Sequence, residues 1–171
     1  MPLTSKTGKT VIVLEAGATH HGFISALELV VSTNKYSSEE GYQPDYWKWQ
    51  VHRTEDLVGE DYPFSYQGAD GLFQTKSITS VLQDREMENE HWSLLFDVIR
   101  SCGVGVFGTP DTYLTALKWA GKTPAGPKPW DAVKVSGADM THVSMIRLLG
   151  GLGLPLLLDA RCTLGELENA I

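Results

Sequence analysis

The feature that most constrains the fold is a recurring order of segments: a short apolar run, a polar tip, and then apolar residues at helical spacing. The first run, Val-Ile-Val-Leu at 11–14, leads into Glu15 and two histidines. Four successive apolar residues suit a strand that is buried on both faces, as in a parallel sheet. Strands that alternate with helices predict parallel βαβ units. The chain is therefore predicted to be an α/β protein with about five such units.

The pattern places each expected element along the chain. Strands are expected at 11–14, 46–51, 104–107, 132–135 and 155–158. Helices are expected at about 23–34, 92–102, 112–117, 143–149 and from 163 onward, with Asp111 as the cap of the third. The connection 52–89 shows neither pattern, so we expect a long functional or mobile loop there. Five units can build a doubly wound open sheet or part of a barrel, and spacing alone does not choose between them.

The composition argues against several kinds of partner. The chain of 171 residues carries 21 acidic and 14 basic side chains, a net charge of -7, so it lacks the basic footprint of a protein that binds nucleic acid or an acidic membrane. Cys102 and Cys162 fit a reducing compartment and form neither a disulfide framework nor a zinc site. No signal peptide or membrane span is visible. We expect a cytoplasmic protein with a flexible leader at 1–10 and one domain at 11–171.

Ionisable side chains accompany the predicted strands, where α/β enzymes carry their sites. Glu15 follows the first strand, and Lys48 and Gln50 share one face of the second because side chains alternate along a strand. Burying such charges inside a parallel sheet is costly, which favours a functional role for them. His20 and His21 are adjacent and would point to opposite faces, so a structural or hydrogen-bonding role is favoured over joint metal binding.

Six segments, in order and over nearly the whole chain, resemble motifs of the sialic acid synthase family (N-acylneuraminate synthases, including the pseudaminic and legionaminic acid synthases). They are Leu-Glu-Ala-Gly-Ala-Thr-His-His-Gly at 14–22 (A-E-x-G-x-N-H-x-G in the family), Trp-Lys-Trp-Gln-Val at 47–51 (V-K-x-Q-T), Glu-Asp-Leu-Val at 55–58 (an acidic stretch), Phe-Gly-Thr-Pro-Asp at 107–111 (S-T-P-F-D), Val-Lys-Val-Ser-Gly-Ala-Asp at 133–139 (Y-K-I-x-S-G-E) and Pro-Leu-Leu-Leu-Asp-Ala-Arg-Cys at 155–162 (P-x-I-L-S-T-G-M). The resemblance implies a partial TIM-type (β/α) barrel, of which this chain is the N-terminal part.

The resemblance also implies an activity in carbohydrate biosynthesis. Family members condense phosphoenolpyruvate with an N-acetylmannosamine-like sugar, giving a nine-carbon keto sugar acid and phosphate. A divalent metal (Mn or Mg) polarises the sugar aldehyde, and the family carries its metal ligands in the second half of the barrel, beyond this chain. The expected partners are therefore phosphoenolpyruvate and an amino sugar, with either a homo-oligomer or a missing C-terminal half completing the barrel.

Site residues follow from the matched motifs position by position. Glu15, Lys48 and Asp139 match catalytic positions, and Asp139 stands where the family has a sugar-contacting glutamate. The positions that match the phosphoenolpyruvate site are Lys48, Lys134, Thr109 and, if the register slips by one, Ser136. The positions that match the sugar site are Gln50 and Asp139.

Three family positions differ in this chain. Thr19 replaces an asparagine, Gly137 replaces a serine, and Asp159 replaces a phosphate-binding serine. A carboxylate at position 159 would repel phosphate unless Arg161 neutralised it. One alternative hypothesis is therefore a non-catalytic half-barrel that acts as a binding or assembly module. Another is an unrelated open α/β enzyme, which a doubly wound strand order would support.

Overall fold

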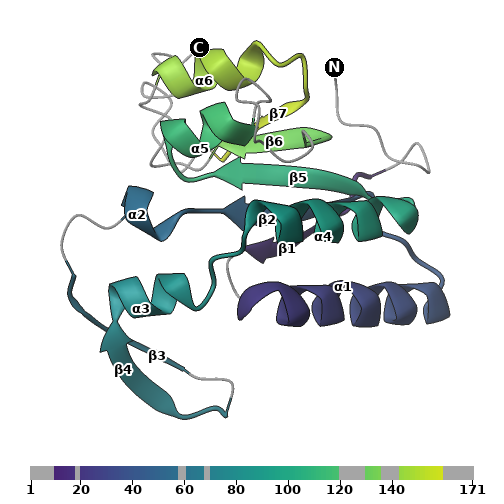
Figure 1. The fold of residues 1–171 in the computed structure, drawn as a ribbon. Coiled ribbons are helices and arrows are strands. Elements are labelled where there is room, and N and C mark those ends of the chain that lie inside the picture. Colours follow the sequence, from purple (N-terminus) through teal and green to yellow (C-terminus); the bar gives the residue numbers. More distant parts are fainter. Residues whose placement is uncertain are drawn as a thin grey trace.

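A parallel five-stranded sheet forms the centre of the protein (Figure 1). The computed structural model describes residues 10–17, 20–57, 61–67, 70–119, 130–135 and 143–159. The strands of this sheet are β1 (Val13–Gly17), β2 (Tyr46–Val51), β5 (Gly105–Pro110), β6 (Ala132–Val135) and β7 (Leu156–Leu158). They lie in the order β1-β2-β5-β6-β7, and every pairing is parallel. A strand order that follows the chain is that of a barrel wall, whereas a doubly wound sheet reverses direction. The partial barrel is therefore confirmed and the doubly wound sheet is excluded.

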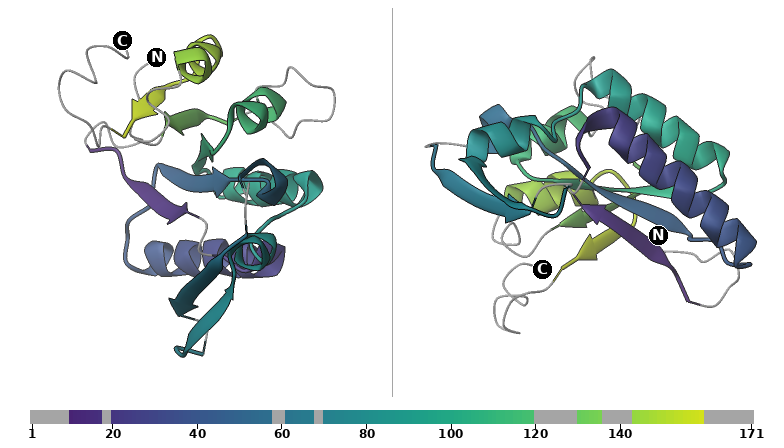
Figure 2. Two further views of the ribbon diagram at one scale, coloured as in Figure 1. Left: turned by 90° about the vertical axis from the view of Figure 1, so that its left-hand side faces the viewer. Right: turned by 90° about the horizontal axis from the view of Figure 1, so that it is seen from below.

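The helices that follow the strands cover one face of the sheet. They are α1 (Gly22–Glu39), α4 (Asn89–Ser101), α5 (Tyr113–Leu117) and α6 (Val143–Gly150). Their buried side chains join one core with the odd-numbered residues of β2, Trp47, Trp49 and Val51. Figure 2 (left) shows these helices around the outside of the curved sheet. Among the described residues, no helix covers the opposite face of the strands, which carries the intervening residues.

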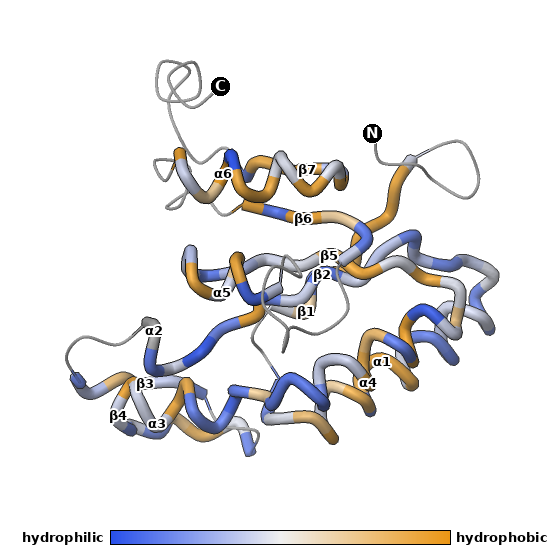
Figure 3. The backbone as a smooth tube through the Cα atoms, turned by 45° about the horizontal axis from the view of Figure 1, so that its top comes forward, coloured by the Kyte–Doolittle hydropathy of each residue, from blue (hydrophilic) through white to orange (hydrophobic). Residues whose placement is uncertain are grey.

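Helix α1 is longer than its apolar spacing predicts. It continues to Glu39, and Gly41, at a φ of +73°, follows its end. The last two turns are mostly polar, so hydrophobic spacing gives no sign of them. Figure 3 shows hydrophobic and hydrophilic stretches alternating along α1 and α4, as expected for helices with one buried face.

The core against the helices is rich in aromatic rings. Trp92 of α4 contacts the rings of His20, Trp49, Phe96 and Trp119. Trp119 in turn stacks on Trp130 with ring centroids 5.2 Å apart. Trp130 lies directly against the backbone of Gly108, where an added Cβ would come within 2.0 Å of the indole ring. Glycine at position 108 is thus required by packing.

The segment 52–89, expected to be a long loop, is instead an ordered insertion for most of its length. It contains α2 (Thr54–Leu57), β3 (Pro63–Gln67), β4 (Phe73–Ser77) and α3 (Ile78–Gln83). The two strands form an antiparallel hairpin that projects away from the main sheet (Figure 1). The expectation was wrong because most residues of the hairpin are exposed on both faces, so the sequence shows no alternation of apolar and polar residues.

Several expectations concern residues outside the described ranges. These are positions 1–9 of the leader, the fifth helix from 163 onward, and Thr19, Ser136, Gly137, Asp139 and Arg161. Within the described ranges, no helix is both long enough and apolar enough to cross a bilayer.

Candidate functional site

Most of the side chains singled out in the sequence come together on the helix-free face of the sheet. Glu15 pairs in register with Lys48, and Gln50 pairs with Thr109. Since partners in a parallel register point to the same face, and residues two apart do so as well, these four side chains share one face. Lys134 of β6 joins them through a direct contact with Glu15. The structure therefore brings together the five predicted site residues that it describes.

The contact between Lys134 and Glu15 spans the site. The Lys134 Nζ atom lies 2.6 Å from Glu15 Oε1 and 3.3 Å from Asp159 Oδ2. The strands of Glu15 and Lys134 are separated by β2 and β5. In a flat sheet three strand spacings amount to about 14 Å. The sheet must therefore curl toward this face, which makes the polar face the concave inner wall of the barrel segment.

The two lysines of this face have opposite shifts in pKa. Burial lowers the pKa of Lys48 from its ordinary value, against the charge of Glu15, which raises it. Burial would also lower the pKa of Lys134, but its hydrogen bonds to Glu15 and Asp159 outweigh burial and raise it. The hydrogen bond from Lys134 lowers the pKa of Glu15. At neutral pH the face therefore presents an ionised Glu15 and a charged Lys134.

Gln50 and Thr109 extend the site toward the carboxyl ends of the strands. Gln50 Nε2 donates to Asp111 Oδ1 at 2.8 Å, which fixes the direction of the amide. Thr109 is fully buried, and its hydroxyl has no hydrogen-bond partner within the described part of the chain. Thr109 therefore lies inside the wall of the site, in register with Gln50.

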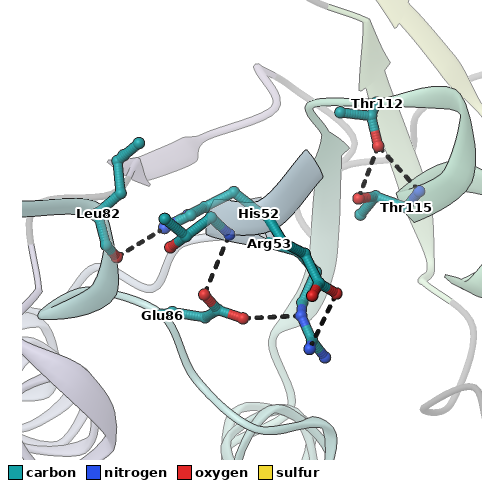
Figure 4. Close-up of polar contacts among 8 residues, drawn as sticks. His52, Arg53, Leu82, Glu86, Thr112 and Thr115 are labelled. Atoms are coloured by element: carbon teal, nitrogen blue, oxygen red, sulfur yellow. Dashed lines mark hydrogen bonds and ion pairs between the residues drawn. The ribbon is translucent and has the colours of Figure 1, made fainter. Parts of the chain in front are cut away.

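Asp111 does not cap the following helix, as the sequence had suggested. The side chain of Thr112 accepts from the backbone N–H of Thr115 at 3.1 Å and is the cap of α5 (Figure 4). Asp and Thr are both good caps, and they are adjacent here, so the sequence could not decide between them. Asp111 instead holds Gln50 and is a site residue that the sequence analysis missed.

A second polar cluster follows the end of β2 (Figure 4). Glu86 forms an ion pair with Arg53, with 2.7 Å between Nε and Oε1, and accepts a hydrogen bond from the backbone N–H of Thr54 at 3.0 Å. The carbonyl oxygen of Leu82 lies 3.1 Å from His52 Nε2. These contacts tie the end of β2 to α3 and to the segment after it, so they position the inserted hairpin. They were missed because Glu86 and Leu82 lie in the segment expected to be a loop.

His20 lies in the aromatic core behind the site. It is 2% exposed, with ring centroids 5.7 Å from Trp49 and 5.6 Å from Trp92. Burial lowers its pKa to about 4, so the imidazole is neutral at physiological pH. This position agrees with a structural role. Within the described ranges, no group of three or more His, Cys, Asp or Glu side chains could hold a metal ion.

Comparison with known proteins supports the fold. No protein-family model matches the sequence, and a search of curated proteins finds no match. Among solved structures, the N-acetylneuraminic acid (sialic acid) synthetase of Leptospira borgpetersenii serovar Hardjo-bovis, in complex with citrate, is similar with a TM-score of 0.69 at 18% identity, over 99% of this chain and 53% of that chain. The spore coat polysaccharide biosynthesis protein SpsE of Bacillus subtilis has a TM-score of 0.64 at 20% identity, over 98% and 40% of the two chains.

A truncated 3-deoxy-D-arabino-heptulosonate 7-phosphate synthase of Thermotoga maritima is also similar, with a TM-score of 0.53 at 13% identity, over 99% of this chain and 51% of that chain. This chain thus spans about half the length, or less, of the solved structures that it resembles. At such identities the likeness shows the fold. The expected resemblance to sialic acid synthases is confirmed at that level.

Proposed function

We propose that this chain is the N-terminal part of a synthase in carbohydrate biosynthesis that joins phosphoenolpyruvate to an N-acetylmannosamine-like amino sugar. The observation that carries the proposal is the group formed by Glu15, Lys48 and Lys134 on the inner wall of the barrel segment. Phosphoenolpyruvate is a small, highly charged anion, and its phosphate and carboxylate need cationic donors. The likeness to a sialic acid synthetase of known structure supports the same substrate class.

The described side chains can be given separate tasks in this reaction. Lys134 and Lys48 would bind the phosphate and carboxylate groups, and their charge would stabilise the departing phosphate. Glu15, which is ionised at neutral pH, would accept a proton from the water that attacks the substrate. The Thr109 hydroxyl and the Gln50 amide would orient the substrates. Ser136 and Asp139 remain the proposed phosphate and sugar contacts among the residues not described.

A divalent Mn or Mg ion would supply a Lewis acid for the sugar aldehyde. The described carboxylates of the inner wall do not form a set of metal ligands. The proposal therefore assigns no step of the reaction to this ion within the described residues.

The test is sugar-dependent release of phosphate. A protein that carries this chain together with the rest of the barrel would be incubated with phosphoenolpyruvate, N-acetylmannosamine and Mn²⁺. Inorganic phosphate would be measured by a colorimetric assay and the keto acid by mass spectrometry. We expect release that requires the sugar and is lost in Lys48→Ala. The matched control is Lys76→Ala, which removes an exposed lysine of the hairpin and should retain activity. Phosphate release that is independent of the sugar, or equal in both variants, would contradict the proposal.

The second candidate function is a binding or assembly module without catalysis. The observation that favours it is that β1 and β7 each have a single strand partner within the described sheet. Unpaired strand edges favour association with another chain. This candidate expects a stable homo-oligomer in analytical ultracentrifugation and no phosphate release. A folded monomer would count against it. A cytoplasmic location is expected under both candidates.

A further inference from the structure

The position of Asp159 relative to Lys134 is fixed by the main chain. Asp159 directly follows β7, and its backbone N–H donates to the Val135 carbonyl oxygen at 3.0 Å. This bond continues the pairing of β7 with β6, the strand that carries Lys134. The carboxylate lies 3.3 Å from Lys134 Nζ and is 28% exposed. The backbone of Asp159 is therefore anchored to β6, and rotation of the Asp159 side chain can take the carboxylate away from the ammonium group without moving the main chain.

The two carboxylates on Lys134 are not equivalent. Glu15 is the nearer one at 2.6 Å and comes from the far side of the inner wall, on β1. Asp159 is more distant from Lys134 Nζ, at 3.3 Å, and it follows β7, the strand at the other edge of the sheet. The side chain of Lys134 is 11% exposed, and both carboxylates lie within 3.3 Å of its ammonium group. An anion that binds this ammonium group therefore has to compete with the two carboxylates.

The charge of the wall also bears on anion binding. Among the described residues, Glu15, Lys134, Asp111 and Asp159 are ionisable side chains that act on Lys48. Together with Lys48, these described side chains are three carboxylates and two lysines. Such a wall attracts an added anion weakly until one carboxylate is removed or displaced.

We propose that Asp159 is an internal competitor for the anion site: its carboxylate takes the place on Lys134 that the phosphate or carboxylate of a ligand would take, and it must rotate away before the ligand binds. Asp159 thereby sets the affinity of the site. The identity of the ligand as phosphoenolpyruvate rests on the proposed function, whereas the competition rests on the Lys134–Asp159 contact.

The test is a calorimetric titration of phosphoenolpyruvate and, separately, of inorganic phosphate. Asp159→Asn removes the charge and keeps the shape of the side chain, and Asp159→Ser is a second variant in case the first folds poorly. We expect both to bind phosphoenolpyruvate about tenfold more tightly than the wild type. The matched control is Asp84→Asn, which neutralises the carboxylate that follows α3 and lies 3.0 Å from Lys76 of the hairpin, and which should leave the affinity unchanged.

A double variant shows whether the gain depends on Lys134. In Lys134→Ala/Asp159→Asn we expect the gain to disappear. An affinity in Asp159→Asn equal to or weaker than that of the wild type would overturn the proposal. If the wild type binds phosphoenolpyruvate through Lys134 and Asp159→Asn does not bind it more tightly, the proposal that Asp159 competes with the ligand is wrong, whereas the proposed function stands. If neither protein binds phosphoenolpyruvate, both fail.

Discussion

The ammonium group of Lys134 lies 2.6 Å from the carboxylate of Glu15, although their strands are separated by two others in the sheet. Residues 119 positions apart in sequence meet because the sheet curls strongly around its helix-free face. Lys48 lies in register with Glu15 on the neighbouring strand β2, on the same face as the pair. The curvature of the sheet thus brings the site residues together, and the contact between Glu15 and Lys134 is a result of that curvature.

The Glu15–Lys134 pair should make the free energy of unfolding depend on pH in the acid range. Because Lys134 lowers the pKa of Glu15 below its ordinary value of 4.5, the contribution of this pair is present above that value and is lost as pH falls through the lower pKa of the folded state. We expect the free energy of unfolding, measured with urea between about pH 5 and pH 3, to fall less steeply in Glu15→Gln than in the wild type. Glu28→Gln, at an exposed position of α1, should retain the wild-type slope. Equal slopes in Glu15→Gln and wild type would show that the pair adds no stability.

Buried His20 should make stability depend on pH in a higher range. Its pKa is about 4 in the folded protein and 6.5 ordinarily, so the unfolded chain takes up a proton first as pH falls. Stability is therefore lost between those two values, by about 3 kcal/mol in total. We expect this loss in urea unfolding of the wild type and its absence in His20→Phe. His21→Phe is the control, because His21 is exposed and its replacement should leave the loss in place.

Gly108 should tolerate no side chain. A Cβ there would meet the Trp130 ring at 2.0 Å, and the strand cannot retreat because β5 is paired on both sides. We expect Gly108→Ala to lower the free energy of unfolding by about 1–3 kcal/mol or more. Gly150→Ala, at a position with open space around the added Cβ, is the matched control and should change stability little. Comparable stability of the two variants would contradict the tight packing of Trp130 on β5.

Thr112 and Asp111 have different roles at the start of α5, and single substitutions should distinguish them. Thr112→Ala should remove a side-chain cap and cost about 1 kcal/mol, with faster hydrogen exchange of the Thr115 amide. Asp111→Ala should leave that amide protected while it frees Gln50. Hydrogen exchange followed by NMR measures both effects. Loss of protection at Thr115 in Asp111→Ala alone would reverse the assignment.

The sequence predicts the parts of this fold that depend on local patterns. Apolar runs such as 155–158 form parallel strands, and alternation correctly places Lys48 and Gln50 on one face. Contacts that depend on sheet curvature, such as Glu15 with Lys134, have no local signal. The β3–β4 hairpin was missed because its exposed residues lack a periodic pattern, and the role of Asp111 because its neighbour is an equally good cap.

The most direct test of the central claim is a calorimetric titration of phosphoenolpyruvate into the wild type, Lys48→Ala, Lys134→Ala and Lys76→Ala. If the inner wall is an anion site, the wild type and Lys76→Ala bind with equal affinity. Lys48→Ala and Lys134→Ala then each weaken binding by about tenfold or more, since each removes a charged hydrogen-bond donor. Equal affinity in all four proteins, or no binding by the wild type, would contradict the claim that Glu15, Lys48 and Lys134 form a site for this anion.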